Sequence, residues 1–187
     1  GDNLAFVIDA DSIKTYQRPY EIYTWDSSIS KAQLVLDKNS SPNGYRVSSD
    51  GEVKFSKDES KLYFGLALPE IVQDTLLLKE EIVNVEVWTY DEPRLYTVQE
   101  QQVKNDKKKS FQTVYHLKEG KLIQIATKEF PNALLSNEGD GDYALISNPE
   151  PYQLSSQWTG LFSKNDLAVM NINSGDSKIA IQSNPTT

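Results

Sequence analysis

Few side chains of this chain could carry out nucleophilic or acid–base chemistry. The one histidine, His116, lies inside an alternating run, VYHLKEGKLIQIA, and a lone histidine on a strand is more often a packing or surface residue than a general base. A hydrolase-type serine needs a G-x-S-x-G turn, which exposes its hydroxyl between a strand and a helix. The sequence contains no such string. We therefore expect no catalytic residue in this chain.

Three acidic segments could bind a cation or act as paired carboxylates. The turn at Gly139–Asp142 (GDGD) places carboxylates on a tight loop, as a calcium site requires, but lacks the ligand spacing of an EF-hand. Glu80–Glu81 and Asp91–Glu92 could supply the two carboxyl groups of a glycosidase. In a chain with 27 acidic residues, adjacent acids are usually solvated loop residues. We expect no metal and no cofactor.

The three tryptophans, Trp25, Trp88 and Trp158, could form a platform on which sugar rings stack. Each lies at or near the end of an expected strand, where packing between sheets would bury it. We therefore expect them in the core.

Composition narrows the classes of partner. The net charge of −8 makes wrapping of a nucleic-acid backbone implausible. The only basic run, Lys107–Lys109, is expected to be a solvated hairpin tip. No apolar run approaches the ~20 residues needed to span a bilayer, and there are no cysteines. Asn39–Ser41 fits a glycosylation sequon, which a bacterial protein would leave unused.

Alternating apolar and polar residues predict mainly strands. Polar and charged residues with weak periodicity suggest either a loop or one short helix within Pro69–Glu81. Ser110–Leu117 is expected to form a hairpin with Leu95–Val103. The other strands are expected at Leu4–Ile8, Glu21–Trp25, Lys31–Leu36 and Val83–Tyr90.

Two pairs of segments repeat along the chain. Val53–Ala67 and Asn132–Ser147 each place a tyrosine seven residues after a serine, and Val114–Ala126 resembles Val169–Gln182. Repeated four-strand units are typical of a β-propeller. We therefore predict an all-β fold: a partial β-propeller of three to four antiparallel four-stranded blades. The single segment 1–187 would hold blades at about 4–37, 53–126 with an insertion at 69–110, and 132–182. Because fewer than four blades do not normally close a ring, we expect a piece of a larger propeller.

Four strings resemble the amino-terminal propeller of bacterial prolyl-oligopeptidase-type (dipeptidyl-peptidase-like) serine peptidases: FSKDESKLYFG, VEVWTYDEPRLYTVQ, VYHLKEGKLIQIA and YALISNPEPYQLSSQW. The resemblance covers roughly residues 50–182. The chain departs from the family pattern at four positions, where Glu59 replaces a turn glycine and Glu92, His116 and Glu138 replace aspartates.

The resemblance implies a non-catalytic segment of an exported, periplasmic or secreted serine peptidase. Such a segment gates or positions peptide substrate for a carboxy-terminal α/β-hydrolase domain. Two alternatives stay open, a stand-alone envelope propeller that binds a protein or glycan, and a glycosidase-type propeller. The chain begins with Gly rather than Met, so we expect it to be cut from a longer polypeptide.

An open ring would also expose two blade faces. We expect either homo-oligomers through the terminal blades or packing of Leu4–Ile8 on the last blade.

Overall fold

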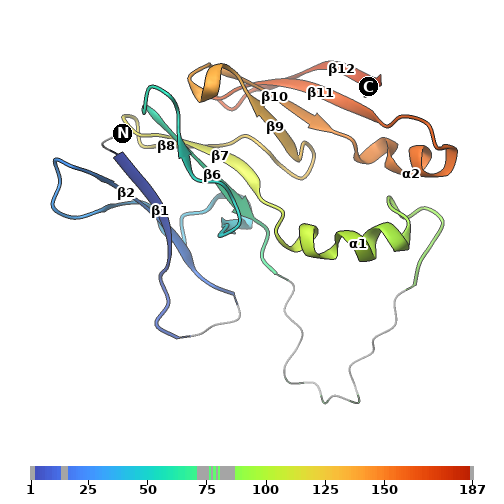
Figure 1. The fold of residues 1–187 in the computed structure, drawn as a ribbon, viewed down its shortest axis with the longest axis horizontal. Helices are drawn as coiled ribbons and strands as arrows, with labels where there is room; N and C mark the ends of the chain where they lie inside the picture. The colour runs from blue at the N-terminus through green and yellow to red at the C-terminus, as the bar shows by residue number, and fades with distance from the viewer. Residues whose placement is uncertain are drawn as a thin grey trace.

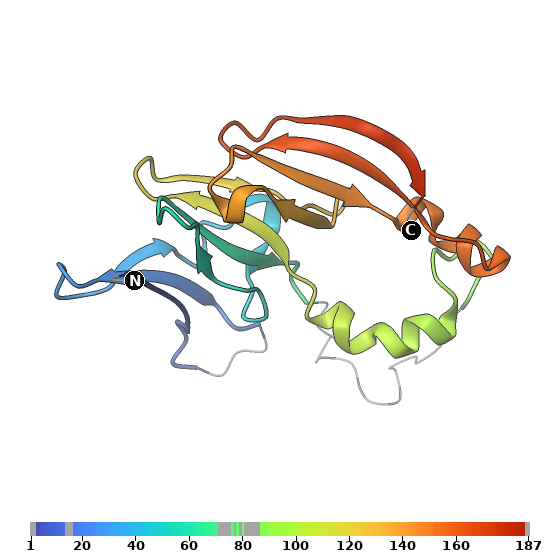
Figure 2. The same cartoon turned by 45° about the horizontal axis from the view of Figure 1, so that its top comes forward.

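The computed structural model describes residues 3–13, 17–70, 76, 78, 80 and 87–185. In this part of the chain the strands form three antiparallel sheets, which follow one another in sequence order. The sheets are stacked, with the amino-terminal sheet at one end and the carboxy-terminal sheet at the other (Figures 1 and 2). The prediction of a mainly β, antiparallel fold is therefore confirmed. The number of blades and their closure into a ring stay predictions.

The first sheet has three strands in the order β1-β2-β3. Its strands are β1 (Asn3–Asp9), β2 (Tyr20–Asp26) and β3 (Gln33–Leu36). Because side chains alternate along a strand, Ala5 and Ile22 pack toward the middle sheet, while Leu4 and Trp25 lie paired on the opposite, exposed face. The three strands predicted for this segment are present in the described part of the sheet.

The middle sheet is built on β6 (Lys61–Ala67), which is buried along its whole length. One edge of β6 pairs with β7 (Phe111–His116), which in turn pairs with β8 (Lys121–Gln124). The other edge is shared by two short strands, β4 (Arg46–Val47) and β5 (Lys54–Phe55). The continuous apolar run LYFGLA in β6 follows from burial on both faces.

The last sheet has four strands in the order β12-β11-β10-β9. These strands are β9 (Asn132–Leu135), β10 (Tyr143–Asn148), β11 (Lys164–Asn171) and β12 (Ser177–Pro185).

Two apolar layers hold the stack together, one at each boundary between sheets. The layer between the first and middle sheets contains Ile22, Leu36, Val47, Leu62, Phe64 and Leu66. The layer between the middle and last sheets contains Tyr63, Val114, Ile123, Ile125, Ala144, Ile146, Ala168, Met170 and Ile172.

The first sequence repeat corresponds to equivalent strand pairs in the fold. The strand register differs between its two members, although the spacing from serine to tyrosine is the same. The Ser56 amide bonds the Lys61 carbonyl, whereas the Ser136 amide bonds the Tyr143 carbonyl. The second turn is therefore two residues longer, and it includes the 3-10 helix η2 (Asn137–Gly139). As a result, the pair Tyr63↔Val114 corresponds to Leu145↔Val169, so Tyr143 does not occupy the place of Tyr63.

Two α-helices interrupt the β structure in the described part of the chain, α1 (Tyr96–Lys107) and α2 (Glu150–Thr159). The prediction of a strand at Leu95–Val103 is wrong. The expected partner strand β7 already pairs with β6 and β8 on its two edges, and the segment contains three Gln residues and one Glu, which favour helix. Consequently Lys107–Lys109 lies at a helix end rather than at a hairpin tip.

Two other predictions fall mainly on residues outside the described part of the chain. Most of Pro69–Glu81 lies there, and so does the first half of Val83–Tyr90. The described half of the latter, 87–90, contains no strand. The alternative in which Leu4–Ile8 packs on the last sheet is not observed, because the two sheets lie at opposite ends of the stack (Figure 2).

Candidate functional site

The two helices belong to insertions at equivalent places in successive sheets. The first insertion, 68–110, joins β6 to β7, and the second, 149–163, joins β10 to β11. Since Tyr63↔Val114 corresponds to Leu145↔Val169, β6 matches β10 and β7 matches β11. Both insertions therefore leave the stack from the same side, where α1 and α2 are found (Figure 1).

Local sequence determines where α2 begins and ends. The Asn148 side chain accepts the amide hydrogen of Glu150 at 2.9 Å, and Pro151 in the first turn lacks an amide hydrogen that a helix start would leave unpaired anyway. Gly160 ends the helix with a φ of 66°, in the left-handed region that favours glycine.

Polar contacts of Tyr152 fix helix α2 to the last sheet. The Tyr152 hydroxyl donates to Asp166 Oδ1 at 2.7 Å, and the Ser183 amide donates to the same oxygen at 2.9 Å. These hydrogen bonds, led by the one from Tyr152, lower the pKa of Asp166. The carboxylate therefore stays charged and continues to accept both hydrogen bonds at neutral pH.

An ion pair sets the path of the chain into α1. Arg94, two residues before the helix, donates to both carboxylate oxygens of Asp106 at 2.7 and 3.2 Å. This hydrogen-bonded pair raises the pKa of Arg94. The fork geometry of the guanidinium suits such bidentate pairing, so the segment before α1 is held back against its last turn.

The two insertions contact each other directly. The Leu95 amide donates to Gln157 Oε1 of α2 at 2.8 Å, and Lys109 forms an ion pair with Glu150 at 3.5 Å. An amide at the start of α1 is thus satisfied by a side chain 62 residues further along the chain.

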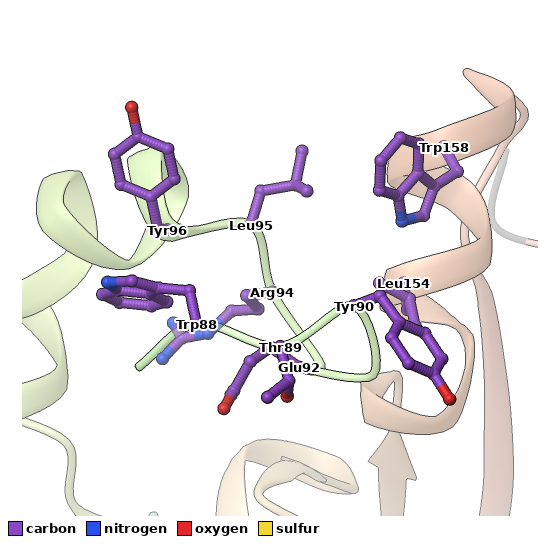
Figure 3. Close-up of a pocket in the computed structure, with 9 residues that line it drawn as sticks. All are labelled: Trp88, Thr89, Tyr90, Glu92, Arg94, Leu95, Tyr96, Leu154 and Trp158. Atoms are coloured by element: carbon purple, nitrogen blue, oxygen red, sulfur yellow. The ribbon is translucent and has the colours of Figure 1, made fainter. Parts of the chain in front are cut away.

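A small aromatic pocket lies between these insertions, with a volume of ≈ 110 Å³. Trp88 and Tyr96 form one wall, with ring centroids 5.7 Å apart, and Leu154 and Trp158 of α2 form the other (Figure 3). Trp158 is 68% exposed, so its ring is open to an incoming ligand. The complete lining is Trp88, Thr89, Tyr90, Glu92, Arg94, Leu95, Tyr96, Leu154 and Trp158.

The polar groups of the pocket gather beside Thr89 (Figure 3). Glu92 is one of the lining residues, and Arg94 is already paired with Asp106. A hydrogen bond from the Thr89 side chain lowers the pKa of the neighbouring Asp91. The lining is thus mainly aromatic and apolar, with the acidic residues Asp91 and Glu92 close by, which suits a ligand with an apolar body and a cationic end.

His116 has a structural role in this fold. It is buried, and its Nε2 lies 2.9 Å from the carbonyl oxygen of Ile172. This contact joins the middle sheet to the last sheet.

The acidic turn 139–142 also joins sheets. The Tyr63 hydroxyl donates to the Gly139 carbonyl at 2.6 Å, and Lys61 Nζ donates to the Asp140 carbonyl at 3.0 Å. Asp140 Oδ1 accepts the Asp58 amide, and Asp142 Oδ1 accepts from Asn173. Among the residues that the structure describes, no three His, Cys, Asp or Glu side chains group as metal ligands.

The remaining sequence candidates separate in space. Trp88 and Trp158 meet in the pocket, while Trp25 lies on the outer face of the first sheet. All three are exposed, so the prediction that they are buried in the core is wrong. Asp91–Glu92 lies beside the pocket, whereas Glu81 is outside the described residues. Asn39–Ser41 is in a loop after β3, where Asp37 accepts the Asn39 amide.

Sequence reasoning missed the pocket residues Tyr96, Arg94 and Leu154. A signal was present, because Trp88, Tyr90 and Tyr96 put three large rings within nine residues. Leu154 could not have been found in this way, since it lies more than fifty residues further on and joins the pocket only through the fold.

Comparisons with known proteins add little. No protein-family model matches the chain, and no curated protein matches it. Among solved structures, TolB from Acinetobacter baumannii is similar at 17% sequence identity and a TM-score of 0.27, over 100% of this chain and 41% of that chain. This chain thus spans well under half of the TolB chain, and the likeness is too low to support an argument. Of the helices described, none has the length and apolar character to cross a membrane.

Proposed function

We propose that this chain is a non-catalytic β-propeller segment that binds peptide and positions it for a hydrolase domain of a longer, exported serine peptidase. One observation carries the proposal, namely the pocket formed where equivalent insertions of two successive sheets meet. The motifs that resemble prolyl-oligopeptidase-type propellers supply the second support.

The chemistry of the pocket favours a peptide with a free amino terminus. Proline and aromatic side chains stack well on tryptophan and tyrosine rings, here Trp88, Tyr96 and Trp158. An ammonium group is attracted both by aromatic faces and by a carboxylate, here that of Glu92. The volume of ≈ 110 Å³ accepts one side chain rather than a whole ligand, as in a site that anchors one end of a peptide.

The placement of the reactive groups supports a role in positioning without catalysis. The one histidine is buried against a carbonyl of the last sheet, away from the pocket. The pocket lining contains one threonine and one acidic residue, Glu92, but no serine, histidine or lysine. Peptide cleavage would therefore be the work of another domain.

A calorimetric titration tests the proposal with three probes: a short proline-containing peptide, the same peptide acetylated at its amino terminus, and a cello-oligosaccharide. We expect saturable binding of the free peptide, weaker binding of the acetylated peptide, and loss of binding in Trp158→Ala. Trp25→Ala is the matched control, because it removes an exposed tryptophan outside the pocket. Peptide binding that survives Trp158→Ala would refute the assignment.

The alternative is a stand-alone envelope propeller that binds a glycan. The exposed rings of Trp88 and Trp158 favour it, because sugar rings stack on such surfaces. Saturable binding of the oligosaccharide together with no binding of either peptide would establish this alternative. A fluorophosphonate probe completes the test, since stoichiometric labelling of one serine would contradict a non-catalytic role.

A further inference from the structure

The last sheet exposes an apolar outer face. Leu134, Leu145 and Val169 form a row across β9, β10 and β11, because Leu134 and Val169 both pair with Leu145. All three are exposed, Leu134 at 68%. Ile181, also exposed, pairs with Leu167 in the next row. Contiguous apolar surface of this kind on a protein usually marks a contact site.

The molecule itself shows what covers such a face. In the middle sheet the corresponding pair, Tyr63 and Val114, is buried at 1% and 0% exposure beneath the last sheet. Its cover consists of small and aliphatic side chains on the facing sheet, such as Ala144 and Ile146. The same row of residues is therefore buried by a neighbouring sheet in the middle sheet and left exposed in the last sheet.

The first sheet exposes a second apolar face at the opposite end of the stack (Figure 2). Leu4 pairs with Trp25, and both side chains are exposed. The Phe6 ring stacks on Tyr23 at 6.0 Å between centroids, and Tyr23 pairs with the exposed Leu34. This outer face of β1–β3 is the second end of the stack.

Charge also distinguishes the two end faces. On the last sheet, exposed Lys178 is paired with Val169. On the first sheet, Glu21 is paired with Ile8 and accepts a hydrogen bond from Tyr23. A basic residue at one end and an acidic residue at the other favour contact between unlike faces over contact between two copies of the same face.

We propose that a second copy of this chain covers the open face, and that the outer face of its β1–β3 sheet is the surface that docks on the outer face of β9–β12. In a two-fold pair each copy presents both faces, so two identical contacts form. Such a pair contains six stacked sheets, within the range of four to eight blades in closed propellers. This inference concerns the 187-residue chain and does not depend on the peptide site.

Light scattering coupled to size-exclusion chromatography tests the proposal. The wild type should have twice the 21.1 kDa mass of one chain. Leu4→Asp on the first sheet and Val169→Asp on the last sheet should each give monomers. In each variant the dissociation constant of the dimer should rise at least tenfold. A mixture of the two variants should regain dimers, because one intact contact remains between unlike copies. Leu161→Asp, which changes an exposed residue in the loop after α2, should leave the dimer unchanged.

Far-ultraviolet circular dichroism establishes that each variant is folded, and Leu134→Asp replaces Val169→Asp if the latter is not. A monomeric wild type would overturn the inference, as would a dimer that persists in either face variant. A mixture that stays monomeric would show that the contacts do not join unlike faces. An equal loss of dimer in Leu161→Asp would show that the effect is not specific to the end faces.

Discussion

Removing the hydroxyl group of Tyr63 should weaken the packing between the middle and last sheets. This hydroxyl donates to the Gly139 carbonyl at 2.6 Å, and both residues are buried. Burial, together with the nearby carboxylates of Asp140 and Asp58, raises the pKa of Tyr63 above its ordinary value. The group therefore remains protonated and able to donate at any pH at which the protein would be studied.

The size of the effect follows from what Tyr63→Phe leaves behind. A neutral hydrogen bond contributes about 0.5–1.5 kcal/mol net, but a buried acceptor without a partner costs about 1–3 kcal/mol. Since the Gly139 carbonyl stays buried while the ring still fills its place, we expect the free energy of unfolding to fall by about 1–3 kcal/mol. With a urea dependence of about 1–3 kcal/mol per molar for small proteins, the midpoint should fall by about 1 M.

Urea unfolding followed by tryptophan fluorescence measures this change. Tyr143→Phe is the matched control, since Tyr143 lies at the same spacing from its serine but is exposed on the outer face. The free energy of unfolding of this control should change by less than about 0.5 kcal/mol. Equal midpoints for the two variants would refute the view that Tyr63 joins the sheets through this bond.

Two further predictions concern stability. Gly65→Ala should destabilise the protein by about 1–3 kcal/mol in the same urea assay, because the added Cβ would lie 2.8 Å from the Cα of Gly51; an unchanged midpoint would contradict this close approach. Hydrogen bonds, first from Ser56 and then from Ser60, hold the pKa of Asp58 well below its ordinary 3.8. The stabilisation from Asp58 is thus present above pH 3.8 and lost as the pH falls further, so Asp58→Asn should reduce the acid-induced fall in stability, and an unaltered pH profile would contradict it.

The strands could be predicted because their alternation reflects burial of one face. Leu4–Ile8 illustrates this, because it forms a strand with one exposed face. The strand after the turn at 57–60 is apolar along its length because both of its faces are buried. Turn chemistry was visible too, because Glu59 replaces a glycine expected by resemblance and has a φ of 55°. That backbone conformation favours glycine.

The register of the repeat could not be read from the sequence. The spacing from Ser56 to Tyr63 equals that from Ser136 to Tyr143, yet η2 lengthens the second turn by two residues. Identical spacings therefore conceal different strand partners.

Helix α1 and the pocket were missed for different reasons. The alternation over Leu95–Val103 predicts a strand, but the propensities of its three Gln residues and of Glu100 favour helix. The pocket depends on two insertions meeting through the contact between Leu95 and Gln157. Only the order of the sheets brings these segments together.

Hydrogen exchange measured by mass spectrometry, with and without a proline-containing peptide that has a free amino terminus, tests the central claim most directly. The account predicts slower exchange in both walls of the pocket, residues 87–96 and Glu150–Thr159, and unchanged exchange in Asn3–Asp9 of the first sheet. Slower exchange in only one wall, or in neither, would contradict a peptide site at the meeting point of the two insertions.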